Sequence, residues 1–378
     1  MLNQQYPILT RVDSHIKPLL VDVLSTDKVG VCYGAIEVDA ISSSCGKVEG
    51  DRFRLSIPYA RQNLTWNVFF DSQCPEIGPD FIFNDNTFLA DMDIDTLSAK
   101  VPSLTKWNPN NTNALLNVLT ELLSCYKQYQ MQLLQKQERL QLEYDMLMKS
   151  TLVKPEDVEM ILLPSGSKPT EARFLINLSV DVSQLESRTC DSETDTAMLF
   201  IVFSGTDWNR VTPQLYLSKT LEKAFDGHPA LNLPHFSADK LLIDYVAEVI
   251  KCIRDKINLI IQGLEKRRAF IAALLSHQFR SVVEYDSVNC TFTIFLHSEQ
   301  DFYIVWRIDL LPGFPNEKPI VTFTSVYHMQ VPHTVYTENY QNFPYNPRWE
   351  LSFMVTKLLN FIQHASKKFR SNCIKKFS

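Results

Sequence analysis

The sequence predicts an α+β protein in which one unit, an antiparallel meander with helices beside it, occurs twice. A tryptophan followed by proline nine residues on, proline thirteen on and phenylalanine seventeen on begins at Trp66 and again at Trp306, 240 residues later. Around each tryptophan, apolar residues alternate with other residues, which is the period of a strand that buries one face. A run with helical periodicity follows each segment and another precedes the second, and this order is typical of the α+β class.

The first copy reads as a meander of three or four strands. Its expected strands are 53–57, 64–70 and 79–83, and the proline-bounded turn lies between the last two. Pro75 and Pro79 bound the turn because neither proline has an N–H to donate to a strand ladder. An irregular stretch that contains Trp107 follows.

A long helical pattern then runs from about Thr112 to Met148. As one helix of about 37 residues it would be roughly 55 Å long and would outreach a small domain. A break near Gln130, which gives two ordinary helices, is an equal alternative.

The middle of the chain predicts strands and a second long helix. The strands are expected at 172–182, 197–203 and 212–218, and the helix at 241–268. Two alternating strands followed by a proline weakly indicate a third copy of the meander, although Pro213 alone does not reproduce the two-proline spacing.

The second copy has the same order of elements as the first. A helix is expected at 266–277, strands at 282–285, 292–296, 304–310 and 319–323, and then an irregular stretch and a terminal helix. We therefore predict domains over residues 1–150, 151–256 and 257–378, of which the first and the last are alike.

Composition favours a globular protein of 378 residues, with 45% hydrophobic and 21% charged residues. The net charge of −6 disfavours general binding to nucleic acid, which relies on clustered Lys and Arg. We expect neither a secretory signal nor a membrane span, and the 8 cysteines without a CxxC pair indicate reduced thiols. One basic cluster is either a solvated helix end or a patch for nuclear import or an acidic partner. It consists of Lys367, Lys368, Arg370, Lys375 and Lys376.

The order of helix, meander, proline turn, strand, loop and helix resembles the fold of ubiquitin-conjugating enzymes. In those enzymes a His-Pro-Asn triplet follows the strand after the prolines, and the cysteine that carries ubiquitin as a thioester comes later. Here His328 is followed by Met329 and Gln330, and no cysteine occurs between Phe323 and Cys373. The corresponding stretch of the first copy, 84–107, contains neither the triplet nor a cysteine.

These departures remove the chemistry of ubiquitin transfer. A thioester needs a sulfur nucleophile, and loss of an oxyanion-stabilising asparagine alone would cost about 3 kcal/mol of barrier. Both copies are therefore similar to ubiquitin-conjugating enzyme variant (UEV) or RWD-like domains, and we expect no catalytic residue. His328, Met329 and Gln330 mark the degenerate position.

Other chemistry is not indicated by the sequence. Neither histidine pair, His328 with His333 or His228 with His235, has a spacing that puts two imidazoles on one helix face, so we expect no metal site. No phosphate-binding loop, dinucleotide motif or nucleophile elbow is present, so we expect no cofactor.

Aromatic and cationic residues of the irregular stretches are candidates for a partner groove. They are Tyr345, Arg348, Trp349 and Trp107. The alternative, which is more common for such clusters, is that they pin a loop to the core.

Sequence words along most of the chain resemble the BRE family, the brain and reproductive organ-expressed proteins. The run 50–88 is similar to the first variant domain of that family. Further words follow in the same order: WNP at 107, LLIDYV at 241, IIQG at 260, EKRRAFIAALLSH at 265, VVEYD at 282, IDL at 308, SVYH at 325 and FPYNPRW at 343. The segment from about 150 to 200, the amino terminus and the last ten residues depart from the family.

The resemblance implies a scaffold or adaptor without catalysis of its own. BRE-like proteins are core subunits of the cytoplasmic BRISC complex and of a nuclear DNA-damage-response complex associated with the breast-cancer susceptibility protein. There they join a zinc-dependent MPN-family deubiquitinase and its Abraxas-type MPN-like scaffold to a von Willebrand A-like adaptor subunit, and the complexes trim non-degradative polyubiquitin. Serine hydroxymethyltransferase and polyubiquitin are further partners to test, whereas nucleic acid and membrane are not expected.

Two other classes of function stay open. One is a ubiquitin-binding variant domain protein that acts alone. The other is an active conjugating enzyme that uses an unorthodox cysteine such as Cys74.

Overall fold

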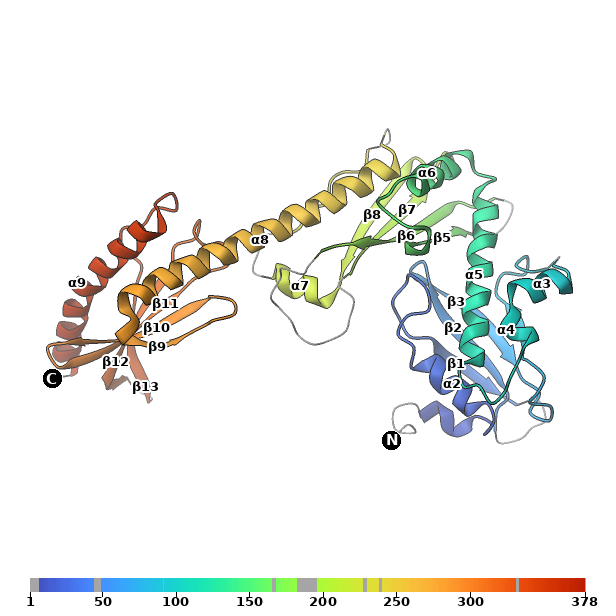
Figure 1. The fold of residues 1–378 in the computed structure, drawn as a ribbon, viewed down its shortest axis with the longest axis horizontal. Coiled ribbons are helices and arrows are strands. Elements are labelled where there is room, and N and C mark those ends of the chain that lie inside the picture. The colour runs from blue at the N-terminus through green and yellow to red at the C-terminus, as the bar shows by residue number, and fades with distance from the viewer. Residues whose placement is uncertain are drawn as a thin grey trace. The chain divides into compact units, whose positions relative to one another are not determined.

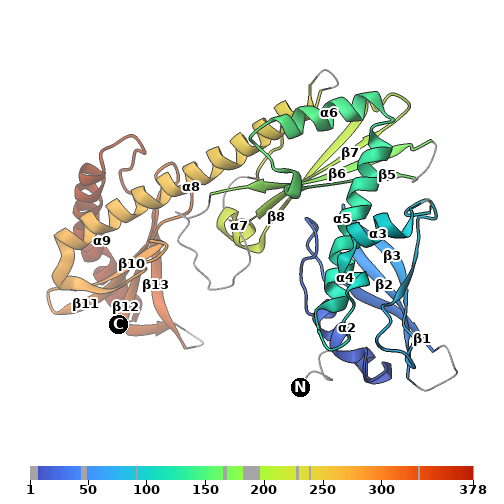
Figure 2. The ribbon, with the colours of Figure 1, turned by 45° about the vertical axis from the view of Figure 1, so that its right-hand side comes forward.

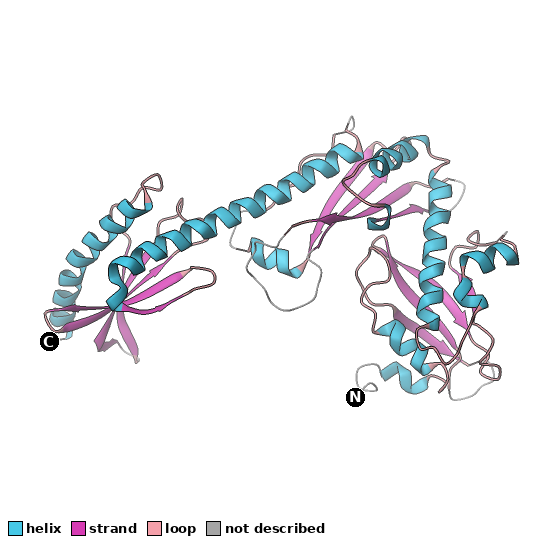
Figure 3. Cartoon of the chain, viewed as in Figure 1, coloured by secondary structure: helices cyan, strands magenta, loops and turns pink. Residues whose placement is uncertain are grey.

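The computed structural model confirms an α+β protein built of antiparallel sheets and helices (Figure 3). It describes residues 7–43, 49–90, 92–164, 168–181, 196–226, 230–237, 240–330 and 333–377. Within these ranges the strands form two four-stranded sheets and one five-stranded sheet. None of the helices in the same ranges combines the length and the apolar character that a membrane span needs.

The chain divides into two compact units (Figure 1). Unit 1 comprises residues 1–179, 196–218 and 233–250, and unit 2 comprises 180–195, 219–232 and 251–378. Helix α8 (Leu242–Gln278) gives its first turns to unit 1 and the rest to unit 2. The helices predicted at 241–268 and 266–277 are therefore one helix, and the predicted domain boundary at 256/257 falls inside it. The division into three domains stays a prediction.

The first part of unit 1 is a four-stranded antiparallel sheet in the order β1-β2-β3-β4, with α5 alongside it (Figures 1 and 2). The strands are β1 (Glu37–Ser42), β2 (Arg52–Tyr59), β3 (Gln62–Phe69) and β4 (Asp80–Phe83). The helices are η1 (Pro7–Arg11), α2 (Lys17–Leu24), α3 (Ile94–Lys100), α4 (Pro102–Thr105), α5 (Ala114–Leu134) and α6 (Glu138–Lys149). Alternating residues of β2 and β3, Trp66 among them, pack with apolar residues of α2 and α5 into one core.

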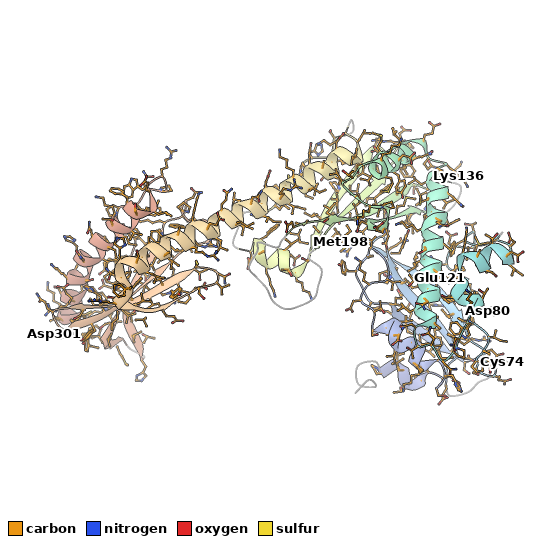
Figure 4. All side chains as sticks on the ribbon, in the orientation of Figure 1. Cys74, Asp80, Glu121, Lys136, Met198 and Asp301 are labelled. Carbon is orange, nitrogen blue, oxygen red and sulfur yellow. The ribbon has the colours of Figure 1, made fainter. Side chains whose placement is uncertain are left out.

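The long helical pattern of the first copy is broken, as one of the two alternatives predicted. Helix α5 ends at Leu134 and α6 begins at Glu138, and Lys136 lies exposed in the connection (Figure 4). Leu134 and Leu140 are both buried. The bend between them lets each helix bury its own apolar stripe.

The second part of unit 1 is a four-stranded meander in the order β5-β6-β7-β8. A short helix η2 (Pro155–Asp157) leads into β5 (Val158–Leu163), and β6 (Glu171–Ser179), β7 (Thr196–Ser204) and β8 (Arg210–Leu217) follow. These strands include the ones predicted at 172–182, 197–203 and 212–218. Pro213 lies in the edge strand β8, where its missing N–H can face away from the ladder.

A buried carboxylate joins the two parts of unit 1. Glu159 on β5 accepts hydrogen bonds from the backbone N–H groups of Val31 at 2.6 Å, Cys32 at 3.3 Å and Ala60 at 2.8 Å. Burial raises the pKa of Glu159, although these three hydrogen bonds and the charge of Lys127 act in the opposite direction. The side chain satisfies backbone donors that would otherwise be buried without a partner.

Two further polar side chains connect helices to neighbouring elements of unit 1. Gln130 on α5 accepts a hydrogen bond from the backbone N–H of Leu162 on β5 at 3.1 Å. Glu143 on α6 accepts one at 2.7 Å from the N–H of Leu242, the first residue of α8. A carboxylate at this place interacts favourably with the positive end of the helix dipole.

Unit 2 is built on a five-stranded antiparallel sheet in the order β13-β12-β11-β10-β9. Its elements are α7 (Lys219–Phe225), the later turns of α8, η3 (Phe279–Ser281), β9 (Val282–Tyr285), β10 (Phe292–Glu299), β11 (Phe302–Asp309), β12 (Ile320–Gln330), β13 (Thr334–Tyr340) and α9 (Leu351–Phe377). The predicted meander lacked β13 and the second half of β12, because the sequence predicts an irregular stretch at both places. The inward residues of β13 are Tyr336, Glu338 and Tyr340, so the apolar alternation on which strand prediction relies is absent.

The repeated sequence pattern is also a repeated strand register. In unit 1, Leu55 and Phe83 flank Trp66 as its paired residues in the neighbouring strands. In unit 2, Phe295 and Phe323 flank Trp306 in the same way. All three positions are offset by 240 residues, and each of these tryptophans is fully buried.

The hairpin turns repeat at the same offset. Ala60 and Arg61 connect β2 to β3 with φ of 46° and 62°, and Gln300 and Asp301 connect β10 to β11 with φ of 49° and 64°. Two consecutive residues with positive φ form the type I′ turn, whose twist matches that of the paired strands. The copies therefore share a type of turn that the sequence does not predict, because neither turn contains glycine.

Candidate functional site

The residues predicted to mark a degenerate catalytic position lie in a β-hairpin. His328, Met329 and Gln330 are the last residues of β12, and Met329 pairs with Val335 while Gln330 pairs with Thr334 on β13. Met329 is 65% exposed. The stretch that the resemblance aligns with the start of the catalytic loop of a conjugating enzyme is a strand pair in this structure.

The imidazole of His328 is held by its neighbours. Its Nδ1 lies 2.9 Å from the hydroxyl of Ser325, and its ring stacks on Phe302 and Phe377 at centroid distances of 5.9 and 4.7 Å. Ser325 itself is buried. This histidine therefore contributes to packing between β11, β12 and the end of α9.

No activated thiol accompanies the hairpin among the described residues. Cys373 is buried in α9, and burial raises the pKa of its thiol. Burial also raises the pKa of Cys32, Cys125 and Cys290. A protonated thiol is a poor nucleophile. Cys45 and Cys190 lie outside the described residues.

A polar cluster ties β13 to α9 beside the hairpin. The carboxylate of Glu338 accepts hydrogen bonds from the hydroxyls of Tyr336 and Tyr340 and from Nδ2 of Asn372, the last at 3.2 Å. Burial acts to raise the pKa of Glu338, but these hydrogen bonds outweigh it and lower that pKa below its usual value. The hydrogen bond to Glu338 raises the pKa of Tyr336 to about 12. Sequence analysis missed this cluster, for which the alternation Tyr-x-Glu-x-Tyr was the one available signal.

Two of the candidate groove residues anchor the proline turns. Trp107 in unit 1 donates its indole N–H to the carbonyl of Pro75 at 3.1 Å. Tyr345 in unit 2 donates its hydroxyl to the carbonyl of Pro315, and burial raises the pKa of Tyr345 to about 12. Pro75 and Pro315 are themselves offset by 240 residues. Both contacts correspond to the loop-pinning alternative.

The other two candidates, Arg348 and Trp349, lie further along the same loop of unit 2. Arg348 is exposed, and Trp349 packs edge-on against Phe353 at 5.0 Å. Whether any of the four residues contacts a partner stays a prediction.

A groove opens on unit 2 where α8 passes the proline turn. It has a volume of about 460 Å³. It is lined by Leu259, Gln262, Gly263 and Lys266 of α8 and by Pro312, Gly313, Phe314, Pro315, Asn316 and Glu317 of the turn. Two hydrogen bonds fix the turn that lines the groove. The buried Arg267 donates to the carbonyl of Pro312 at 3.1 Å, and the hydroxyl of Tyr345 donates to the carbonyl of Pro315. The hairpin at His328 is not part of its lining.

Within the described residues, no three His, Cys, Asp or Glu side chains come together in a way that could hold a metal ion. His228, which was considered in one histidine pair, lies outside those residues.

Comparison with known proteins gives matches over nearly the whole chain. The family model of the brain and reproductive organ-expressed proteins (BRE) matches residues 10–329. A protein of Danio rerio named "BRISC and BRCA1-A complex member 2" is 33% identical over 377 residues, which cover 96% of this chain and 95% of the relative. A protein of the same name from Branchiostoma floridae is 32% identical over 372 residues, covering 96% of each. The matches span both copies of the meander and the sheet between them, and the chain therefore belongs to the BRE family.

Proposed function

We propose that the chain is a non-catalytic scaffold subunit of a deubiquitinase complex. The observation that carries the proposal is the similarity along 96% of the chain to proteins named as members of the BRISC and BRCA1-A complexes. In this role the chain links a zinc-dependent MPN-family deubiquitinase and an Abraxas-type scaffold to a von Willebrand A-like adaptor subunit. The assembly trims non-degradative polyubiquitin in the cytoplasm and the nucleus.

The two repeated units act in this proposal as UEV-like domains. The shared register, the paired type I′ turns and the proline turn pinned by an aromatic side chain support a common fold for both. The strand pair at Met329 and the raised pKa of the buried Cys373 thiol support a role without thioester chemistry.

The adaptor docks, in this proposal, through a proline-containing peptide in the groove of unit 2. Proline-rich segments favour grooves with apolar and aromatic walls, because their extended conformation is preformed. Such a peptide would be part of a larger interface on the order of 800 Å² per partner.

Gly263 offers a sharp way to test this groove. A Cβ added there would meet no described atom closer than 3.7 Å, so a side chain can enter the groove without a clash at its base. Replacing a helical glycine by leucine also favours the helix. Gly263→Leu should therefore block the groove in a folded protein, and Gly263→Ala is the matched control that leaves most of it open.

The experiment is affinity purification of the tagged full-length chain, its Gly263→Leu variant and its Gly263→Ala variant, followed by quantitative mass spectrometry. We expect the wild type and the alanine variant to recover all three partner classes in a fixed ratio, and the leucine variant to lose the adaptor alone. Recovery of the wild-type chain without any deubiquitinase would overturn the proposed function. Equal recovery of the adaptor by all three proteins would overturn the assignment of the groove.

A further inference from the structure

Among the described residues, the first copy has no counterpart of one strand of the second copy. In unit 2, β12 pairs on its outer side with β13 through residues 321–324. The same positions of the first copy, at the offset of 240 residues, are 81–84, at the end of β4. Strand β4 is the last strand of its sheet. In the first copy, no strand of the described residues lies beside the edge that β13 covers in the second copy.

The missing strand leaves β4 partly uncovered. Val321 and Phe323 of β12 are 0% exposed, whereas their counterparts Phe81 and Phe83 are half-buried and Ile82 is 57% exposed. Apart from the pairing with β3, no backbone group of Asp80–Phe83 forms a backbone hydrogen bond to another described residue. Such an edge can template a further strand.

The charges around β4 select what that strand can be. Between residues 62 and 99 the sequence contains no lysine or arginine. It contains seven acidic residues there; Asp71, Glu76, Asp80, Asp93 and Asp95 are exposed, Asp85 is buried, and Asp91 lies outside the described residues. A second copy of the same edge would bring like charges together, which is unfavourable across paired strands. A basic strand is the complementary occupant.

We propose that the outer edge of β4 binds an extended basic segment of a partner protein as an added antiparallel strand. Asp80 and Ile82 point to the same exposed face of the sheet, because side chains two residues apart share a face. In an antiparallel pair, an apolar residue opposite Ile82 is followed two residues later by the residue opposite Asp80. The site therefore selects the pattern apolar-x-Lys or apolar-x-Arg. Figure 4 labels Asp80 on this part of unit 1. This site does not depend on the proposed function.

The test uses the full-length chain and a fluorescein-labelled peptide, Thr-Val-Thr-Val-Thr-Lys-Thr, in an anisotropy titration. We expect saturable binding, and an amide hydrogen exchange rate at residues 80–84 at least tenfold slower in the complex. Asp80→Lys should weaken binding of this peptide about three- to tenfold and strengthen binding of the peptide with Glu in place of Lys. The matched control is Ile320→Lys, which changes the corresponding position of the second copy and should leave binding as in the wild type.

Three results would overturn the proposal: no saturable binding by the wild type, equal loss of binding with Ile320→Lys, or the same affinity of Asp80→Lys for both peptides. A fourth concerns the chain without peptide. If amides 80–84 exchange as slowly as amides 321–324, the β4 edge is already covered.

Discussion

Single carboxylates, the buried Glu159 and the half-buried Glu338, connect elements of this protein. Glu159 supplies one acceptor group to three backbone donors, two in the loop before β1 and one in the turn between β2 and β3. In unit 2, Glu338 accepts hydrogen bonds from side chains instead: two tyrosine hydroxyls of its own strand and the amide of Asn372. Sequence analysis could not predict the Glu159 contacts, since the partners lie 128, 127 and 99 residues away. For Glu338 the two tyrosines lie two residues away and gave a local signal, whereas Asn372 lies 34 residues away.

Removing the Glu159 carboxylate should destabilise unit 1. In Glu159→Ala, the N–H groups of Val31, Cys32 and Ala60 lose their acceptor, and we expect a loss of about 2 to 4 kcal/mol in the free energy of unfolding. Urea denaturation followed by tryptophan fluorescence measures it. Glu156→Ala, at an exposed ion pair with Lys154, is the control and should change stability by less than about 0.5 kcal/mol. A loss no larger than that of the control would contradict the role of Glu159.

The charge of Glu338 should make unit 2 sensitive to acid. Because the folded pKa is lowered below the unfolded value of about 4.3, the carboxylate contributes its full stability above that pH and loses it as pH falls through the folded pKa. The melting temperature of Glu338→Gln should therefore lie below that of the wild type at pH 7 and approach it near pH 3. Calorimetry between these limits measures the difference.

The same variant has an optical signature. Tyr336 has a pKa of about 12 because its hydroxyl donates to Glu338. In Glu338→Gln this pKa should fall toward 10, so that the variant shows more tyrosinate absorbance at pH 11 than the wild type. Tyr336→Phe in the Glu338→Gln background removes the extra absorbance. Titration curves that coincide for the wild type and Glu338→Gln would argue against this hydrogen bond.

At the scale of elements, the repeated meander could be predicted because its information is local. Alternation around Trp66 and Trp306 and the prolines that follow suffice to place strands and a turn. The sequence did not predict β13, whose inward face includes polar groups. It also did not predict that two helical runs form the single helix α8, although no helix-stopping residue separates them. That His328, Met329 and Gln330 mark a degenerate catalytic position stays a prediction; their place in a strand pair depends on β13 and was missed with it.

The left-handed turn residues make an element-level prediction. At Asp301, with φ of 64°, glycine adopts the required conformation freely and a β-branched residue does not. We expect Asp301→Gly to be more stable than Asp301→Val by about 1 to 2 kcal/mol. At Ser298, an exposed position of strand β10, the order should reverse, since valine is favoured over glycine in strands. Denaturation of the four variants tests both orders, and an equal ranking at the two positions would refute the turn assignment.

The whole molecule should be inert as a ubiquitin carrier. Incubation with activating enzyme, ATP and ubiquitin should give no adduct that a reducing agent releases, because a thioester needs a thiolate and the hairpin at Met329 holds none among the described residues. Cys74 is the partly exposed cysteine in the first proline turn, so Cys74→Ser is the informative comparison. A reducible adduct that disappears in Cys74→Ser would show an active enzyme.

Because equivalent positions of the two copies have the same spacing along the chain, we expect their central segments to be exchangeable. Residues 55–83 and 295–323 have the same length. Each segment begins and ends at a residue paired with the tryptophan of its own copy, and each contains a two-residue turn of the same type. Grafting one into the place of the other would preserve every inward and outward direction along the strands, since no register slip is introduced. Such chimeras would carry the surface of one copy on the frame of the other.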